Sequence, residues 1–140
     1  MGTRRKSREL TMQMLFQGDL GKQTPDEVGK LFWASVTDVD AETRGFAEDL
    51  HRVATSRSAE IDALIEQHSE NWRIERMPVV DRNLLRCGIA EMLGYPMTPA
   101  AIVINESLEV ARRYAAPESI HFLNGVLDAV ARDLLKARLG

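Results

Sequence analysis

Apolar residues recur along this chain at intervals of three and four positions, the spacing of one face of an α-helix. The last third shows the pattern best, where Leu123, Leu127, Val130 and Leu134 follow one another at intervals of four, three and four. The strict alternation of apolar and polar residues that typifies strands is not found. We therefore predict an all-α fold, a compact bundle of about six to seven helices joined by short loops.

Prolines, glycines and capping residues predict where these helices begin and end. Thr24, with Pro25 and Glu27 after it, has the spacing of a capping box at a helix start. Asp40 and Ser58 are expected to cap the next two helices. The remaining breaks are expected at Gly18 and Gly21, across 71–77 before Pro78, at 94–96, at Thr98-Pro99 and at Pro117. We expect one domain over 1–140, with an N-terminal helical half over about 1–70 and a C-terminal helical half over about 78–138.

Two glycines and two amides interrupt the apolar helices of the C-terminal half. Gly lowers helix stability by about 1 kcal/mol relative to Ala, so Gly88 and Gly125 need a reason to be there. Close contact between helices is the explanation we favour for both. For Asn105 the favoured explanation is a buried structural hydrogen bond, and for Asn124 a bond to a neighbouring backbone group.

Composition indicates a folded protein without a membrane span. Of the 140 residues, 44% are hydrophobic and 28% are charged, which is typical of a globular chain. No apolar run approaches the ~20 residues that cross a bilayer, and the apolar stretch of a secretory signal does not follow the basic N-terminus. Cys87 has no second cysteine with which to form an internal disulfide, which fits a cytoplasmic protein.

The net charge of −3 is unevenly distributed. Residues 1–18 carry four basic residues and one acidic residue, whereas residues 19–70 carry five basic and twelve acidic residues. A polyanion is therefore expected to meet a basic N-terminal tip and not a generally basic surface. The residues of this tip are Arg4, Arg5, Lys6 and Arg8. Guanidinium groups suit phosphate because their planar fork donates two hydrogen bonds at once.

The residues that enzymes need are not found in recognisable arrangements. The three histidines show no metal-ligand spacing, and no P-loop, GxGxxG or GxSxG motif occurs. Cys87 lies on an apolar helical face, where cysteine is more often a small hydrophobic residue than a nucleophile. Trp33 and Trp72 are interpreted as packing residues. We therefore predict no catalytic activity, no cofactor and no metal.

Four segments in combination resemble one known family. They are the basic N-terminus with the REL and LF that follow it, VVDRNLLR ending at Arg86, INESLEVARRY ending at Tyr114, and FLNGVLD starting at Phe122. This combination is similar to the transcription antitermination factors of the NusB family, and the resemblance covers essentially the whole chain. It implies an all-helical RNA-binding protein that pairs with NusE, a small ribosomal protein. The two would act on the boxA element of ribosomal RNA leader transcripts, with the transcription elongation complex.

The resemblance implies two groups of RNA contacts. The cations of the basic N-terminal tip would hold phosphates, and four such contacts to a single strand predict a slope of about −2.8 in log affinity against log salt. At the start of the last helix, Phe122 would stack on a base while Ser119 and His121 bond nearby. The alternative for Phe122 is core packing. Two departures bear on this end, Ala115 where the family often has Gly and His121 where it often has Lys.

The resemblance also implies a protein-binding face. Glu75, Asp81, Asn105 and Glu106 lie where the family's motifs are richest, and an acidic patch there would meet the basic surface of NusE. Helix-start chemistry is an equal alternative for Asp81, which is predicted in a first turn. Because a surface that docks a partner can also dock a second copy, the sequence leaves a homodimer open.

Two other functions remain as alternatives. One is a helical protein-interaction module that binds no nucleic acid, which the acidic residues of 19–70 would suit. The other is the RNA-binding module of an RNA cytosine methyltransferase, without activity of its own, which would need a separate cofactor domain. Binding experiments with RNA separate the first of these from an antitermination factor.

Overall fold

All regular structure in the described part of the chain, residues 3–70 and 72–139 of a computed structural model, is helical. The prediction of an all-α fold is therefore confirmed. No described helix combines the length and the apolar character needed to cross a membrane. The elements are α1 (Thr3–Gly21), α2 (Pro25–Ser35), α3 (Ala41–Ser56), α4 (Ser58–Gln67), the 3-10 helix η1 (Ile74–Arg76), α5 (Val79–Gly94), α6 (Ala100–Tyr114) and α7 (Ser119–Leu139).

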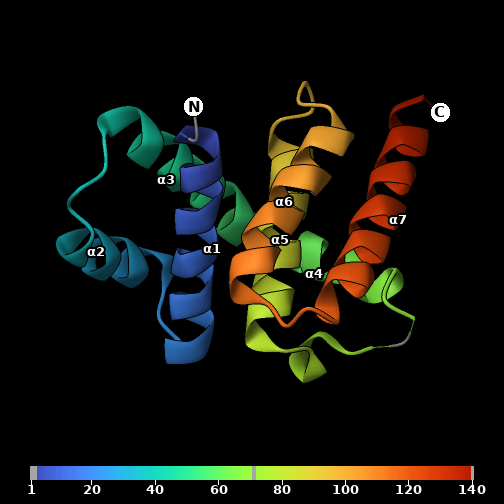
Figure 1. Cartoon of the computed structure of the whole chain (residues 1–140), viewed down its shortest axis with the longest axis horizontal. Helices are drawn as coiled ribbons and strands as arrows, with labels where there is room; N and C mark the ends of the chain where they lie inside the picture. The colour runs from blue at the N-terminus through green and yellow to red at the C-terminus, as the bar shows by residue number, and fades with distance from the viewer. Residues whose placement is uncertain (1–2, 71, 140) are drawn as a thin grey trace.

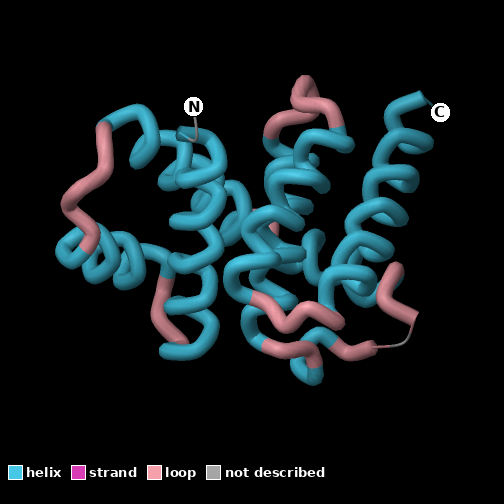
Figure 2. The backbone as a smooth tube through the Cα atoms, in the orientation of Figure 1, coloured by secondary structure: helices cyan, strands magenta, loops and turns pink. Residues whose placement is uncertain are grey.

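The helices α1, α6 and α7 stand roughly side by side, with α5 behind α6 and with α2 and α3 on the far side of α1 (Figure 1). The connecting loops gather at the ends and outer edge of this arrangement (Figure 2). A large buried cluster draws apolar side chains from α1 and from α3 to α7, including Leu50, Leu85 and Leu127. A smaller one joins α1, α2 and α3 around Met14, Phe32 and Trp33. Both sides of α1 are therefore packed against other helices, which fixes where its polar residues point.

The predicted helix starts divide into those the structure confirms and one that is wrong. Glu27 N donates to Thr24 Oγ1 at 3.2 Å and Thr24 N donates to Glu27 Oε1 at 2.8 Å, so the capping box is present. Thr43 N donates to Asp40 Oδ1 at 2.8 Å, as expected of a cap. Ser58 is not a cap, because it is already the first residue of α4. Arg57 occupies the cap position and makes no side-chain capping bond there.

Two predictions about helix interiors fail and one holds. A Cβ on Gly88 would lie 2.9 Å from Ser107 Oγ and 3.1 Å from Leu127 Cδ2, so close packing of α5 against α6 and α7 requires glycine. A Cβ on Gly125 would meet nothing within 4 Å, so the same explanation is wrong there. Asn105 is exposed, and its predicted buried hydrogen bond is also wrong. Glycine at 88 was required by packing, whereas glycine at 125 needs another reason.

Ala115 shows that the departure from the family's glycine carries no strain. It caps the end of α6 with φ −95° and ψ 161°, an extended conformation that any residue adopts. A left-handed stop, which would favour glycine, is not formed there. The substitution therefore leaves the connection from α6 to α7 undisturbed.

Candidate nucleic-acid interface

The basic N-terminal tip occupies the first turns of α1, and three of its four cations face solvent. Arg4, Arg5 and Lys6 are exposed. The Arg4 guanidinium lies 3.8 Å from the ring centroid of Phe46, a cation–π contact that holds the side chain in place while its edge stays open. All three side chains therefore lie at the surface, although Arg5 and Lys6 also pair there with carboxylates.

Arg8 corrects the expectation that all four cations of the tip are open to phosphate. It is 7% exposed, and its Nε and Nη2 each donate to a carboxylate oxygen of Glu91 on α5 at 2.7 Å. Burial opposes its charge, but the hydrogen bonds and charge of Glu91 raise the pKa of Arg8 above its usual value. The pair therefore fastens α1 to α5. The sequence could not separate Arg8 from its neighbours because the partner lies far away in the chain, on α5.

A seam of polar contacts joins α1 to α6 along the exposed face. Arg5 Nε and Nη2 donate to the two carboxylate oxygens of Glu106 at 2.9 Å each. Glu9 holds two cations at once, with Lys6 Nζ at 3.1 Å and Arg113 Nη1 at 2.6 Å. The seam therefore keeps cations of both helices in fixed positions at the surface. The hydrogen bond and charge of Arg5 lower the pKa of Glu106, although burial raises it.

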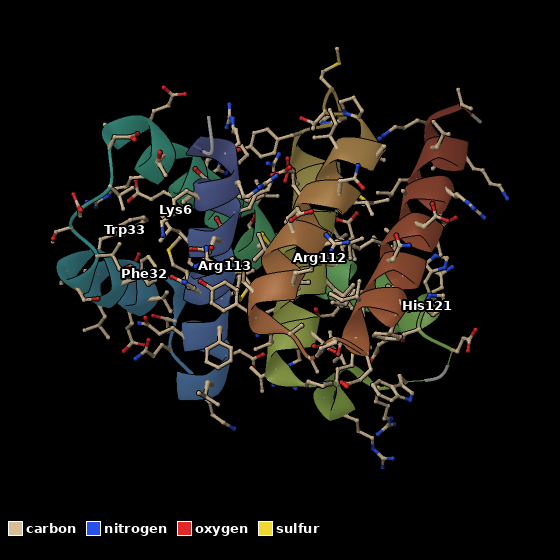
Figure 3. All side chains as sticks on the ribbon, viewed as in Figure 1. Lys6, Phe32, Trp33, Arg112, Arg113 and His121 are labelled. Atoms are coloured by element: carbon tan, nitrogen blue, oxygen red, sulfur yellow. The ribbon has the colours of Figure 1, made fainter. Side chains whose placement is uncertain are left out.

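The end of α6 supplies cations that sequence reasoning missed. The side chains of Arg112 and Arg113 are 54% and 67% exposed, and Tyr114 beside them accepts a hydrogen bond from Gln13 Nε2 at 2.9 Å. Figure 3 shows Lys6, Arg113, Arg112 and His121 in succession from α1 across α6 to α7. We call these four residues, three cations and a histidine, the cation row. The sequence ARRY contains both arginines, but we used it only as part of the family motif and not as a candidate phosphate-binding site.

The second predicted RNA group, at the start of α7, lies away from the basic N-terminal tip (Figure 1). His121 is exposed, and Phe122 is partly buried against the main core with its ring centroid 5.4 Å from that of Trp72. Ser119 is bonded to Asp81. The two predicted groups therefore do not form one cluster.

The four residues predicted to bind a partner are not brought together. Glu75 is exposed in η1, whereas Asn105 lines a groove of about 590 Å³ between α6 and α7. Glu106 belongs to the seam with Arg5. Asp81 is 4% exposed, and burial raises the pKa of its carboxyl even though the bond with Ser119 opposes this. Of these four residues, Glu75 is the one whose carboxylate is exposed and lies outside the seam.

The last three polar residues of VVDRNLLR build a separate network at the C-terminal end of α1. Asp19 accepts from Arg82 Nε at 2.6 Å and Nη2 at 2.8 Å, from Asn83 at 2.9 Å and from Arg86 Nη1 at 2.9 Å. Arg86 also makes two bonds to Asp62 of α4. Burial alone would raise the pKa of Asp19, but these bonds and the charges of the two arginines lower it. The motif thus joins α1, α4 and α5.

The side chains considered as a nucleophile or as metal ligands lack the surroundings that these roles need. Cys87 is buried, and burial raises the pKa of its thiol far above the usual value, so a thiolate is not formed at neutral pH. Among the described residues no three histidine, cysteine or acidic side chains are grouped so that they could hold a metal ion. Trp33 is buried as expected, but Trp72 is 51% exposed.

Comparison with known proteins points to one family. A model of the NusB family matches residues 5–132. The transcription antitermination protein NusB of Koribacter versatilis is 62% identical over 95% of this chain and 91% of its own length. The protein of the same name from Desulforapulum autotrophicum is 43% identical over 93% of this chain and 92% of its own.

The chain belongs to the NusB family. Solved structures of the family share the fold. T. maritima NusB superimposes with a TM-score of 0.84 at 30% identity, covering 92% of this chain and 90% of that one. A complex of the antitermination factors NusB and NusE with double-stranded RNA gives a TM-score of 0.86 at 28% identity, covering 95% of this chain and 98% of that one. The resemblance first seen in the sequence is therefore confirmed.

Proposed function

We propose that this chain is a transcription antitermination factor that binds boxA-type single-stranded RNA together with NusE and supports ribosomal RNA transcription. Its membership of the NusB family and the fold shared with a NusB–NusE–RNA complex support this. The observation that carries the proposal is the set of exposed cations on α1 and α6, which the seam brings together at one surface. The protein acts by binding, in the cytoplasm with the elongation complex, and no chemical step is involved.

The RNA lies across the α1–α6 seam. Arg4, Arg5 and Lys6 hold phosphates at one end, and Arg112 and Arg113 hold them further along. His121 and Phe122, with Ser119 beside them, face the bases at the start of α7, since phosphate contacts alone carry no sequence information. Five phosphate contacts give a slope of about −3.5 in log affinity against log salt.

NusE docks on a separate face, near η1 and the start of α5. Glu75 is the exposed carboxylate there, and buried Asp81 shapes the surface by tying α5 to Ser119. Asn105 in the α6–α7 groove and Glu106 in the seam lie apart from this face and are not part of the proposed NusE contact. Because both partners bind one protein and contact each other, each raises the affinity of the other by the same factor.

The deciding experiment measures binding of labelled boxA-like RNA and of a scrambled RNA at 50–300 mM salt, with and without NusE. We expect tighter binding of the boxA-like RNA, and a larger preference once NusE is added. Equal, weak and salt-sensitive binding of both RNAs would overturn the proposal in favour of a protein-interaction module. An RNA affinity that NusE does not change would overturn the proposed coupling between the two partners and leave the RNA-binding proposal standing.

A matched pair of variants locates the site. Reversing Arg4, Arg5 and Lys6 to Glu abolishes most of the salt slope, and Arg8 is left in place because its reversal would unfold the protein. The control reverses Lys30, Arg44 and Arg52, three exposed cations on α2 and α3. It changes the net charge equally but leaves RNA affinity within a small factor of wild type.

A further inference from the structure

The α6–α7 groove, of about 590 Å³, lies outside the surfaces proposed to hold RNA and NusE. Of the described residues that line it, none is a cation of that RNA surface. Apolar side chains from both helices make up much of the lining, among them Ala100, Ala101, Ile104 and Ala131. Leu135, on the α7 side, is 55% exposed. An exposed apolar hollow of this size indicates that another surface covers it.

The residues of α7 that line the groove include one straight stripe. Its members recur at intervals of four, three, four and three, which places them on one face of the helix: Asn124, Asp128, Ala131, Leu135 and Arg138. Between the acid and the base of this stripe lie a small and a large apolar side chain. Turned end for end, the stripe places Asp128 opposite Arg138 and Ala131 opposite Leu135. Both pairs are centred on position 133, so a single two-fold axis forms them together.

Both charged residues of the stripe are open to a further partner. Arg138 Nη2 donates to Met92 O at 2.9 Å, and within the described residues Arg138 forms no ion pair with a carboxylate. Asp128 accepts from Arg132 Nη2 at 2.8 Å, but its side chain remains 48% exposed, and a carboxylate can hold two cations, as Glu9 does. Because ten residues of helix separate Asp128 from Arg138 by about 15 Å, the two cannot pair within one chain.

We infer that the α6–α7 groove is the contact between two copies of this chain, with their α7 helices antiparallel. The exposed Leu135 of each copy lies over the small Ala131 of the other, and Asp128 of each pairs with Arg138 of the other. A stripe that complements its own reverse in both size and charge fits a second copy better than a foreign partner, because an isologous contact requires this symmetry. The inference goes beyond the proposed function and does not rest on it. The pair leaves the RNA and NusE surfaces of both copies open.

Sedimentation equilibrium from about 1 to about 500 µM measures the dissociation constant of the dimer. We expect the wild-type chain to dimerise reversibly within this range, as is typical of an interface of modest size. Leu135→Glu puts a charge into the apolar centre of the contact, and we expect it to weaken the dimer by about tenfold or more. A wild-type chain that stays monomeric throughout would overturn the inference.

The matched control is Leu31→Glu on α2, because Leu31 is 54% exposed against 55% for Leu135. Both side chains lie at the surface, so both variants retain the fold. We expect Leu31→Glu to leave the dissociation constant of the dimer unchanged. Equal weakening by the two variants would overturn the inference, since it would show that the added charge acts without regard to its place.

A charge exchange tests the antiparallel register. Asp128→Lys and Arg138→Glu each place like charges opposite one another in both symmetric pairs, and we expect each variant alone to weaken the dimer by about tenfold. In an equimolar mixture of the two, both pairs of a mixed dimer again join opposite charges, so the dissociation constant should return to within a small factor of wild type. Neither chain is repaired by mixing, so recovery does not come from folding. A mixture that dimerises no better than either variant alone would overturn the inference.

RNA and NusE are the other candidate occupants of the groove, and binding assays separate them from a second copy. The affinities of Leu135→Glu and Leu31→Glu for boxA-like RNA and for NusE are measured at concentrations where the protein is monomeric. We expect both variants to match wild type, because the groove lies outside both surfaces. Weaker binding of RNA or of NusE by Leu135→Glu alone would assign the groove to that partner and overturn the inference.

Discussion

The two ends of α1 use the same chemistry, arginine against carboxylate, for different purposes. At the C-terminal end Asp19 is 17% exposed in its side chain and collects Arg82, Arg86 and Asn83 from α5. At the N-terminal end Arg5 is 53% exposed and rests on one carboxylate of α6. The first arrangement uses every group to fasten helices together. The second leaves a charged edge open to solvent.

Arg8 shows that the division follows burial and not sequence position. It lies three residues from Arg5 on the same helix and makes the same two-bonded contact with a glutamate, yet its side chain is 8% exposed against 53%. A buried ion pair whose partner is removed leaves an uncompensated charge, whereas an exposed pair contributes little. The number of arginines therefore does not show how many can contact RNA. The exposure of each guanidinium decides this.

The largest effect is expected from breaking the buried pair. Arg8→Met leaves Glu91 charged and buried, so the free energy of unfolding falls by about 3–5 kcal/mol. Urea denaturation measures this as a lower midpoint at an unchanged slope. The double variant Arg8→Met with Glu91→Leu recovers most of the loss. A single variant that loses less than about 1 kcal/mol would place Arg8 with the exposed cations.

A smaller loss is expected at the other end of α1. Asp19→Asn removes the charge that Arg82 and Arg86 share and lowers the free energy of unfolding by about 1–3 kcal/mol at neutral pH. The folded-state pKa of Asp19 lies below its ordinary value of 3.8, so its contribution is complete above that value and is lost as pH falls through the folded pKa. The stability difference between wild type and variant should therefore narrow from about pH 5 to about pH 2. A constant difference would show that charge is not the cause.

The exposed cations are expected to affect RNA binding and not folding. Arg4→Gln with Arg112→Gln removes two exposed charges, and the carboxylate that pairs with Arg112 is itself exposed. The salt slope becomes shallower by about 1.4, so the affinity lost between 50 and 200 mM salt is about sevenfold smaller than in wild type. Lys30→Gln with Arg52→Gln is the control of equal charge. A slope shared by both double variants would mean that net charge alone governs binding.

The smallest effect is expected from the exposed pair of the seam. Glu106→Gln changes the free energy of unfolding by less than about 1 kcal/mol, because Arg5 is half-exposed and because buried Arg8, 3.6 Å from Glu106, keeps its closer pair with Glu91. It frees the Arg5 guanidinium for phosphate, so RNA binding tightens by up to about fivefold, the factor that such a pair energy represents. Glu48→Gln on α3 makes the same charge change elsewhere. Weaker RNA binding by Glu106→Gln would show instead that the carboxylate holds Arg5 in its binding orientation.

Local features of the fold could be predicted from the sequence because their causes lie within a few residues. The caps at Thr24 and Asp40 close bonds three residues away. Ser58 failed because α3 runs to Ser56 and leaves a single residue, Arg57, between the helices. The helices themselves were visible in the spacing of their apolar residues, which the two buried clusters account for.

The interface could be predicted only in part, because its selection depends on contacts between distant segments. Exposure of Arg5 and burial of Arg8 are decided by the positions of α5 and α6, which no local pattern records. Arg112 and Arg113 were overlooked because two arginines at a helix end are common, and only the contact with Glu9 places Arg113 beside α1. Gly125 was noticed, but packing does not account for it, because an added Cβ would meet nothing within 4 Å.

Cys87 is a chemical probe for local opening of the fold. The thiol is buried on α5 and donates to the backbone oxygen of Arg8 on α1 at 3.7 Å. A thiol-specific reagent therefore reacts only when the helices packed around Cys87 open, and the only cysteine in the chain gives a single, unambiguous signal. The labelling rate in native buffer therefore reports how often the packing around Cys87 opens, and α1 with the basic N-terminal tip is part of that packing. A slower rate with RNA bound would show that RNA binding stabilises this packing.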